Sequence, residues 1–359
     1  EAFEKVHAPK TPQEADRALK RLIFEELLYL QLVLLKQKQA VTVDLEGVRF
    51  ESVGEKFNYF YKENLPFELT GAQKRVMKEI RADLNTGCHM NRLLQGDVGS
   101  GKTIIALMTS LLAIDNDYQA CIMAPTEILA QQHFNGITEL LGEMDVRVEL
   151  LTGSVTKSAR RPILEGLENG EVDIIIGTHA LIEPAVKFQN LGLAVIDEQH
   201  KFGVAQRSKL WAKASISPHV LVMTATPIPR TLAMTAYGDL DCSVLDEMPP
   251  GRKEIKTVHR TDGNRLAVHN FIEKQILEGR QVYVVYPLIE ESATLDHKDL
   301  MDGYESLTRR FPLPKFKIGV VHGRMKPDDK EIEMQRFAKG VTQILVATTV
   351  IEVGVNVPN

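Results

Sequence analysis

"GDVGSGKT", residues 96–103, matches the pattern G-x-x-x-x-G-K-[ST] of a phosphate-binding loop. In such loops backbone amides surround the phosphates, the lysine reaches the β- and γ-phosphates, and the hydroxyl residue binds Mg²⁺. Residues 92–95 predict a strand before the loop and residues 103–114 a helix after it. This context disfavours the alternative, a glycine-rich turn without a ligand, because a helix N-terminus favours bound anions. We therefore expect a nucleotide and Mg²⁺ to bind here, at Gly96, Asp97, Gly99, Ser100, Gly101, Lys102 and Thr103.

Short apolar runs alternate with helical segments between about residues 66 and 250. Nearly all-apolar strands separated by helices indicate a parallel sheet with both faces covered. The sequence therefore predicts an α/β fold with a doubly wound parallel sheet. Its predicted strands are residues 92–95, 120–124, 172–178, 193–197 and 220–226.

A second alternating run follows "PPGR" at 249–252, which has the composition of a linker. A three-stranded sheet with an open edge is a poor stopping point, so we expect this second domain to be incomplete. Its predicted strands are residues 281–287, 317–323 and 343–349, and its predicted helices lie near 262–278 and 326–339. The predicted domains are residues 1–64 (a linker helix and connector), 65–252 and 253–359 (truncated).

The linker helix has a recognisable start. Thr11 can cap it, Pro12 suits its first position, and Glu14 completes a capping box. The apolar residues that follow recur at spacings of three and four, which predicts a helix to about Lys38 with one face packed on another element. These residues are Leu19, Leu22, Ile23, Leu27, Leu30 and Leu34. We expect residues 41–64 to form a connector across the surface.

Composition narrows the class of protein. The longest apolar stretch, "LLYLQLVLL" at 27–35, is too short to span a membrane, and no secretory signal opens the chain. We expect a cytoplasmic fragment of a longer protein. The three cysteines lie far apart, which disfavours metal sites and disulfides and favours buried thiols. The net charge of −5 counts mildly against a DNA-coating protein but leaves room for a local basic groove.

The stretch "LAVIDEQHKFGVAQR", residues 193–207, places an acidic pair at the end of an apolar strand. A strand often ends in charged residues simply because the chain has reached water. A phosphate-loop enzyme, however, needs a carboxylate for its metal at the neighbouring strand end. We therefore expect Asp197 to orient Mg²⁺ and Glu198 to activate the attacking water. His200 alone would more often be structural, and it is a candidate catalytic residue only because it adjoins this pair.

The order of the motifs resembles that of superfamily 2 helicases. The matching stretches are "APTEILAQQH" (124–133), "LTGS" (151–154), "IGTHAL" (176–181), "DEQH" (197–200), "TATPIPRTL" (224–232), "YPLIEES" (286–292), "VVHGRMKPDDKE" (320–331) and "ATTVIEVGVNVPN" (347–359). Within that superfamily "DEQHKFGVAQR" and "TATPIPRTLAMTAYGDLD", with the N-terminal helix, resemble the bacterial RecG family most. Transcription-repair coupling factors share most of these stretches and are the alternative.

The resemblance implies two RecA-like domains and an ATP-dependent, monomeric, cytoplasmic bacterial helicase. It would translocate on double-stranded DNA and act on branched DNA, such as stalled forks and Holliday junctions, in recombination and repair. An RNA helicase and a non-hydrolysing ATP-dependent clamp are further alternatives. The family's Q-x-x-G-R-x-G-R arginine motif does not occur in this sequence. Loss of such an arginine typically costs about 10³ to 10⁵ in turnover, so we expect this chain to bind ATP but hydrolyse it slowly.

The resemblance also implies residue roles. Phe67 would stack on adenine, Gln73 would hydrogen-bond its edge, and Gly354 would face the nucleotide from the second domain. Thr224 and Thr226 would couple the ATP site to DNA. Hydroxyls and loop amides contact phosphate oxygens without reading bases. The implied DNA contacts are Thr126, Thr152, Gly153, Thr178, His179, Thr348 and Thr349. Asn356 departs from the family, which usually has an aspartate there.

Overall fold

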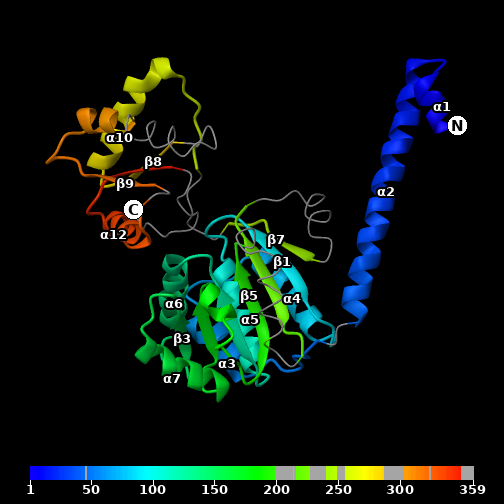
Figure 1. Cartoon of the computed structure of the whole chain (residues 1–359), viewed down its shortest axis with the longest axis horizontal. Coiled ribbons are helices and arrows are strands. Elements are labelled where there is room, and N and C mark those ends of the chain that lie inside the picture. Colours follow the sequence, from blue (N-terminus) through cyan, green and yellow to red (C-terminus); the bar gives the residue numbers. More distant parts are fainter. Residues whose placement is uncertain are drawn as a thin grey trace. The chain divides into compact units, whose positions relative to one another are not determined.

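The structure is a computed structural model, in which the chain divides into two compact units, Glu1–Arg252 and Lys253–Asn359 (Figure 1). It describes residues 1–44, 47–198, 213, 216–226, 240–248, 255–286, 303–322 and 325–348.

The first unit contains a seven-stranded sheet in the order β3-β4-β2-β5-β6-β1-β7, and every neighbouring pair is parallel. This confirms the predicted parallel α/β fold. The strands are β1 (Asn91–Gly96), β2 (Gln119–Met123), β3 (Val148–Leu151), β4 (Ile174–Gly177), β5 (Leu191–Asp197), β6 (His219–Thr224) and β7 (Asp241–Leu245). The sequence analysis missed β3 and β7. Both are edge strands, and each carries residues less buried than those of the five central strands.

Helices cover both faces of this sheet, as a doubly wound fold requires. On one face, α4 (Gly71–Leu84), α5 (Lys102–Ile114) and α6 (Glu127–Leu141) pack on strand residues such as Val195. On the other face, α7 (Lys157–Glu168) and the 3₁₀ turn η2 (His179–Ile182) pack on their alternate neighbours, such as Ile196. The alternation along β5 therefore turns Asp197 toward the face that carries α5 and α6.

Residues 47–64 are part of this unit rather than a surface connector, which corrects the sequence expectation. Phe50 and Phe60 are buried in the core, and the segment forms α3 (Glu55–Tyr59) and the π-helical turn η1 (Phe60–Asn64). Asp115, just after α5, accepts hydrogen bonds from the backbone amides of Lys56 (3.1 Å) and Phe57 (3.0 Å). These contacts replace the side-chain cap that α3 lacks.

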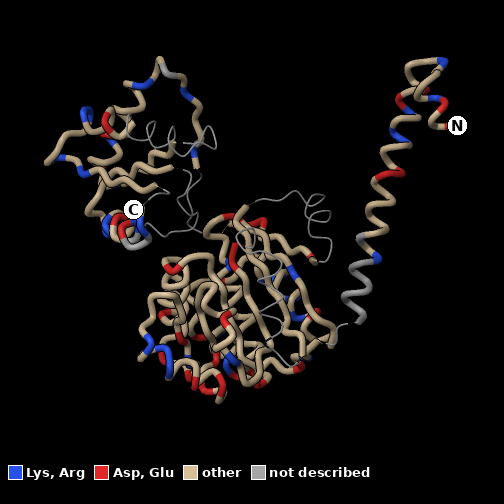
Figure 2. Tube along the Cα trace, in the orientation of Figure 1, with Lys and Arg blue, Asp and Glu red and all other residues tan. Residues whose placement is uncertain are grey.

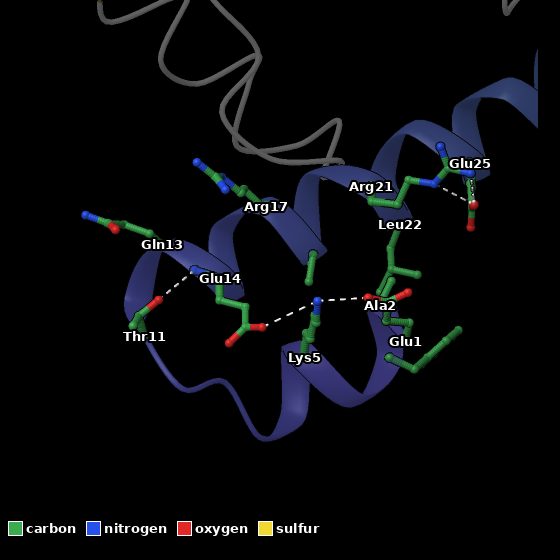
Figure 3. A pocket seen from close by; sticks show the side chains of 12 residues that line it. Glu1, Ala2, Lys5, Thr11, Gln13, Glu14, Arg17, Arg21, Leu22 and Glu25 are labelled. Atoms are coloured by element: carbon green, nitrogen blue, oxygen red, sulfur yellow. Dashed lines mark hydrogen bonds and ion pairs between the residues drawn. The ribbon is translucent and has the colours of Figure 1, made fainter.

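The N-terminal helix α2 (Pro12–Asp44) follows the short helix α1 (Ala2–His7) and runs past the predicted end at Lys38. Thr11 caps it as predicted, since its hydroxyl accepts from the Glu14 amide at 3.2 Å, but Glu14 reaches back to the amide of Lys10 rather than of Thr11. Figure 3 shows the groove between the two helices, where Lys5 bridges Glu1 (2.9 Å) and Glu14 (3.5 Å).

α1 packs on the start of α2, but most of the described residues on the predicted apolar face of α2 are exposed. Leu19, Ile23, Leu27 and Leu30 are exposed, and Ala18 is the one side chain of α2 that is buried among those described. None of the helices in the described part of the chain combines the length and the apolar character that a membrane span requires.

The cysteines meet the expectation only in part. All three are free thiols. Cys121 is buried in β2, and burial raises the pKa of its thiol to about 12. Cys242 is half-buried and Cys88 is exposed, so the expectation of three buried thiols is wrong for Cys88.

The second unit contains a three-stranded parallel sheet in the order β8-β10-β9. Its strands are β8 (Val282–Tyr286), β9 (Ile318–Val321) and β10 (Ile344–Thr348), as predicted. The helices α10 (Arg265–Leu277) and α12 (Pro327–Ala338) also match the prediction, whereas a helix over residues 303–310 was missed. The 3₁₀ turn η4 (Asp262–Asn264) leads into α10, and Phe311 and Val346 belong to the core of this unit.

Candidate nucleotide and nucleic-acid site

The phosphate loop connects β1 to α5 at the carboxyl edge of the sheet. Gly99 and Gly101 have φ angles of +77° and +91°, which L-residues rarely adopt. The Lys102 ammonium donates to the backbone carbonyls of Gly96 (2.7 Å) and Asp97 (3.0 Å). The lysine thus bonds its own loop. A bound phosphate could replace these two carbonyls as the partner of the ammonium group.

The loop fits a bound phosphate in two further respects. The Ser100 hydroxyl is buried and finds no hydrogen-bond partner among the described residues, so it lacks a group to bond. A Cβ at position 96 would lie 2.5 Å from that hydroxyl oxygen, so only glycine at this position leaves room for the Ser100 side chain. Thr103 follows as the second residue of α5, and its half-buried position is compatible with the predicted Mg²⁺ contact.

Gln73 hydrogen-bonds the phosphate loop from a buried position. It is fully buried; its amide nitrogen donates to the Ser100 carbonyl (2.9 Å) and its amide oxygen accepts from the Thr70 amide (2.9 Å). Thr70 completes a capping box with Gln73 at the start of α4. In this structure the side chain of Gln73 braces the loop, and its hydrogen bond to adenine stays a prediction. Phe67 is 40% exposed, and its stacking on adenine stays a prediction.

The acidic pair lies at the same edge as the loop. Asp197 is the last residue of β5 and pairs with Met223 of β6, while Thr224 of β6 pairs with Gln95 of β1. Asp197 was predicted to lie on the strand next to the loop, which is wrong because β6 lies between β5 and β1. Two inter-strand steps span roughly 10 Å, a gap that Mg²⁺ with its water and phosphate ligands can fill.

Glu198 is held by β6 and the residues just after it. One carboxylate oxygen accepts from the Ala225 amide at 3.0 Å, and the other accepts from the Thr224 hydroxyl at 3.4 Å. The Thr224 oxygen in turn contacts the Thr226 hydroxyl at 2.8 Å. Glu198 has φ +51°, which costs energy in a non-glycine residue and often marks a functional site.

His133 was not singled out by the sequence analysis. It lies on α6, and its Nε2 is 2.8 Å from a carboxylate oxygen of Asp197, with both side chains 12% exposed. One feature of the sequence could have pointed to His133. It follows Thr126, the residue that caps this helix, by seven positions, so both lie on the same face of α6.

The predicted DNA-contacting residues of the first unit follow the neighbouring strands β2, β3 and β4. Thr126 caps α6, since its hydroxyl accepts from the Leu129 amide at 3.5 Å. Glu127 accepts from the Ser154 amide at 3.1 Å, which ties the loop after β3 to the start of α6. Gly153 is exposed beside this contact. These loops therefore form one continuous surface at the edge.

The remaining predicted DNA contacts differ in exposure. His179 is exposed, whereas Thr152, Thr178 and Thr348 are buried. The Thr152 hydroxyl contacts that of Ser154 at 2.9 Å, and the hydroxyls of Thr178 and Thr348 find no partner within the described ranges. A buried hydroxyl needs a local rearrangement to reach a phosphate, and the DNA contacts of these three threonines stay predictions. His200, Thr349 and Gly354 lie outside the described residues.

Charge is dispersed over the first unit. Figure 2 shows its Lys and Arg residues interspersed with Asp and Glu, rather than gathered in one stripe. A nucleic acid at this edge would therefore be contacted through loop amides and small polar groups as well as cations.

Comparison with known proteins decides the family. The DEAD/DEAH box helicase family matches residues 70–235, and the helicase conserved C-terminal domain matches residues 265–359. ATP-dependent DNA helicase RecG of Synechocystis sp. is 47% identical over 358 residues, 100% of this chain and 43% of that protein. The chain belongs to the RecG helicase family.

Other RecG proteins agree. RecG of Bacillus subtilis is 46% identical over 359 residues, 100% of this chain and 52% of that protein. A structure of RecG bound to a three-way DNA junction has a TM-score of 0.82 and 41% identity, and the match covers 99% of this chain and 46% of that one. The chain thus spans about half the length of these RecG relatives. Its two units are RecA-like helicase domains.

Proposed function

We propose that this chain is the ATP-driven motor of a DNA helicase that translocates on double-stranded DNA and acts on branched DNA. Stalled forks and Holliday junctions, in recombination and repair, are its expected substrates. The observation that carries this proposal is the phosphate loop at the same sheet edge as the buried Asp197–Glu198 pair, in a chain that is similar to RecG over all of its own residues.

The residues of the first unit suit hydrolysis of the terminal phosphate of ATP. Lys102 would leave its loop carbonyls and bond the β- and γ-phosphates. Thr103 and Asp197 would hold Mg²⁺, which supplies charge neutralisation to the phosphates when bound. Glu198 accepts the proton of the attacking water, and its bonds to Ala225 and Thr224 fix the carboxylate for that task.

The same edge would bind DNA and adenine. Phe67 would stack on adenine, while Thr126, Gly153 and His179 would contact the DNA backbone. We further propose a monomer in the bacterial cytoplasm. The absence of the sequence Q-x-x-G-R-x-G-R supports slow hydrolysis by the 359-residue chain itself.

Binding and turnover test this function together. Fluorescent ATP and a labelled three-way DNA junction should each bind the chain, and Lys102→Ala should abolish only the nucleotide signal. A longer protein that carries this chain should hydrolyse ATP faster with junction DNA than with RNA of equal length. Equal stimulation by RNA, or nucleotide binding that survives Lys102→Ala, would refute the proposal.

A further inference from the structure

His133 is in contact with the carboxylate on which the proposed Mg²⁺ site depends. Its Nε2 lies 2.8 Å from Asp197 Oδ2, a distance typical of a charge-assisted hydrogen bond. An ionised carboxylate only accepts hydrogen bonds, so Nε2 carries the proton and donates. The contact joins two elements far apart in sequence, α6 and the end of β5.

From this geometry we infer that His133 is a positioning residue for Asp197, an inference that rests on the proposed role of Asp197. By holding Oδ2, the imidazole fixes the rotation of the carboxylate and leaves Oδ1 to face the metal. Groups that hold a metal-binding carboxylate tune the affinity of the site, and their loss typically weakens metal binding about 10- to 100-fold.

The environment of the pair supports a fixed orientation. Both side chains are 12% exposed, so little water is available to replace the imidazole as a donor. Asp197 also points to the sheet face that α6 covers, because β5 alternates between the two core clusters. Without His133, the buried carboxylate would lose this donor and could turn.

The test uses variants that separate the donor from the bulk of the ring. His133→Gln places an amide nitrogen near the position of Nε2, whereas His133→Asn is too short to reach Asp197. His133→Leu keeps most of the volume without a donor. Gln131→Leu is the matched control, since Gln131 is exposed on the same helix and contacts only Asn135 among the bonds described for it.

The measurement is binding of a fluorescent ATP analogue to the 359-residue chain as free Mg²⁺ is varied. We expect His133→Leu and His133→Asn to raise the Mg²⁺ concentration for half-maximal binding about tenfold or more. His133→Gln should stay within about threefold of the parent chain, and Gln131→Leu should match it. Circular dichroism checks folding, and the Gln and Asn variants decide the matter if the Leu variant unfolds.

Two results would overturn the inference. Either His133→Asn and His133→Gln shift the Mg²⁺ dependence equally, which indicates a packing role, or neither shifts it. Asp197→Asn separates a failure of the inference about His133 from a failure of the proposed role of Asp197. If Asp197→Asn raises the Mg²⁺ requirement and the His133 variants do not, only the inference fails. If Asp197→Asn has no effect, the proposed function of Asp197 fails as well.

Discussion

His219 should make the stability of the first unit depend on pH between about 6.5 and 4. The residue begins β6 and is fully buried. Its Nδ1 accepts from the Met90 amide at 3.0 Å, and its Nε2 donates to the Val48 carbonyl. Burial lowers the pKa of the imidazole from 6.5 to about 4. Protonation would also place a second donor opposite the Met90 amide.

The sign follows from where the protons bind. Between pH 6.5 and 4 the unfolded chain protonates His219 while the folded chain does not, so the unfolded state gains protons as the pH falls. The stabilising contribution is complete above the unfolded pKa and is lost as the pH falls through this window. A pKa difference from 6.5 to about 4 corresponds to about 3 kcal/mol, because each pKa unit is worth about 1.4 kcal/mol.

Urea unfolding from pH 7.5 to 4 measures this effect. Circular dichroism follows the loss of helix and strand at each pH. His219→Asn retains an acceptor for the Met90 amide but does not titrate. It should be less stable at pH 7.5 and should lose stability less steeply with acid than the parent chain.

Carboxylates titrate in the same range, but both chains share them, so the difference between the two curves isolates His219. His7→Asn, at an exposed position on α1, controls for removal of a histidine. Parallel curves for His219→Asn and the parent chain would refute the argument, because they would show that the buried imidazole binds protons alike in both states.

Three further predictions concern the site and its support. Gly101→Ala should weaken nucleotide binding at least about tenfold in a fluorescence titration, because φ +91° costs an L-residue about 1–2 kcal/mol. The added Cβ would also lie 2.2 Å from Gln73 Nε2. Adding Gln73→Ala should therefore recover part of the loss. Glu198→Gln should slow single-turnover hydrolysis about 10²- to 10⁴-fold and leave ATP binding unchanged, so an equal loss of both would contradict a role as base. Asp115→Ala should lower the free energy of unfolding by about 1–2 kcal/mol in urea, with a smaller loss for Asp115→Asn, because the start of α3 loses both of its acceptors.

The central strands could be predicted because both faces of the sheet are covered, so β2, β4, β5 and β6 are nearly all apolar in sequence. The edge strands β3 and β7 are less buried and carry polar residues such as Glu149 and Asp241, which hide the pattern. Local sequence also gave no sign that residues 47–64 contribute to the core, because Phe50 and Phe60 pack on elements distant in the chain.

The candidate site divides in the same way. The phosphate loop and the Asp197–Glu198 pair are local sequence patterns, and both could be read directly. Strand order is not local, so the position of β6 between β5 and β1 required the structure. The contact between His133 and Asp197 joins residues 64 positions apart, and no spacing rule reaches that far.

The order of strands suggests that a helix, rather than the sheet, would couple the loops proposed to contact DNA to the nucleotide residues at this edge. β3, β4 and β2 lead into the loops proposed to contact DNA, and β5, β6 and β1 lead into the nucleotide residues. The strands cannot slide past one another without breaking their ladder of hydrogen bonds, whereas helices packed on a sheet can shift by about 1–2 Å. Because Thr126 caps α6 and His133 lies two turns later on the same face, a shift of the helix start would move His133 relative to Asp197. His133 thus links α6 to Asp197 by one hydrogen bond, whose donor can be removed by substitution while Asp197 itself is kept.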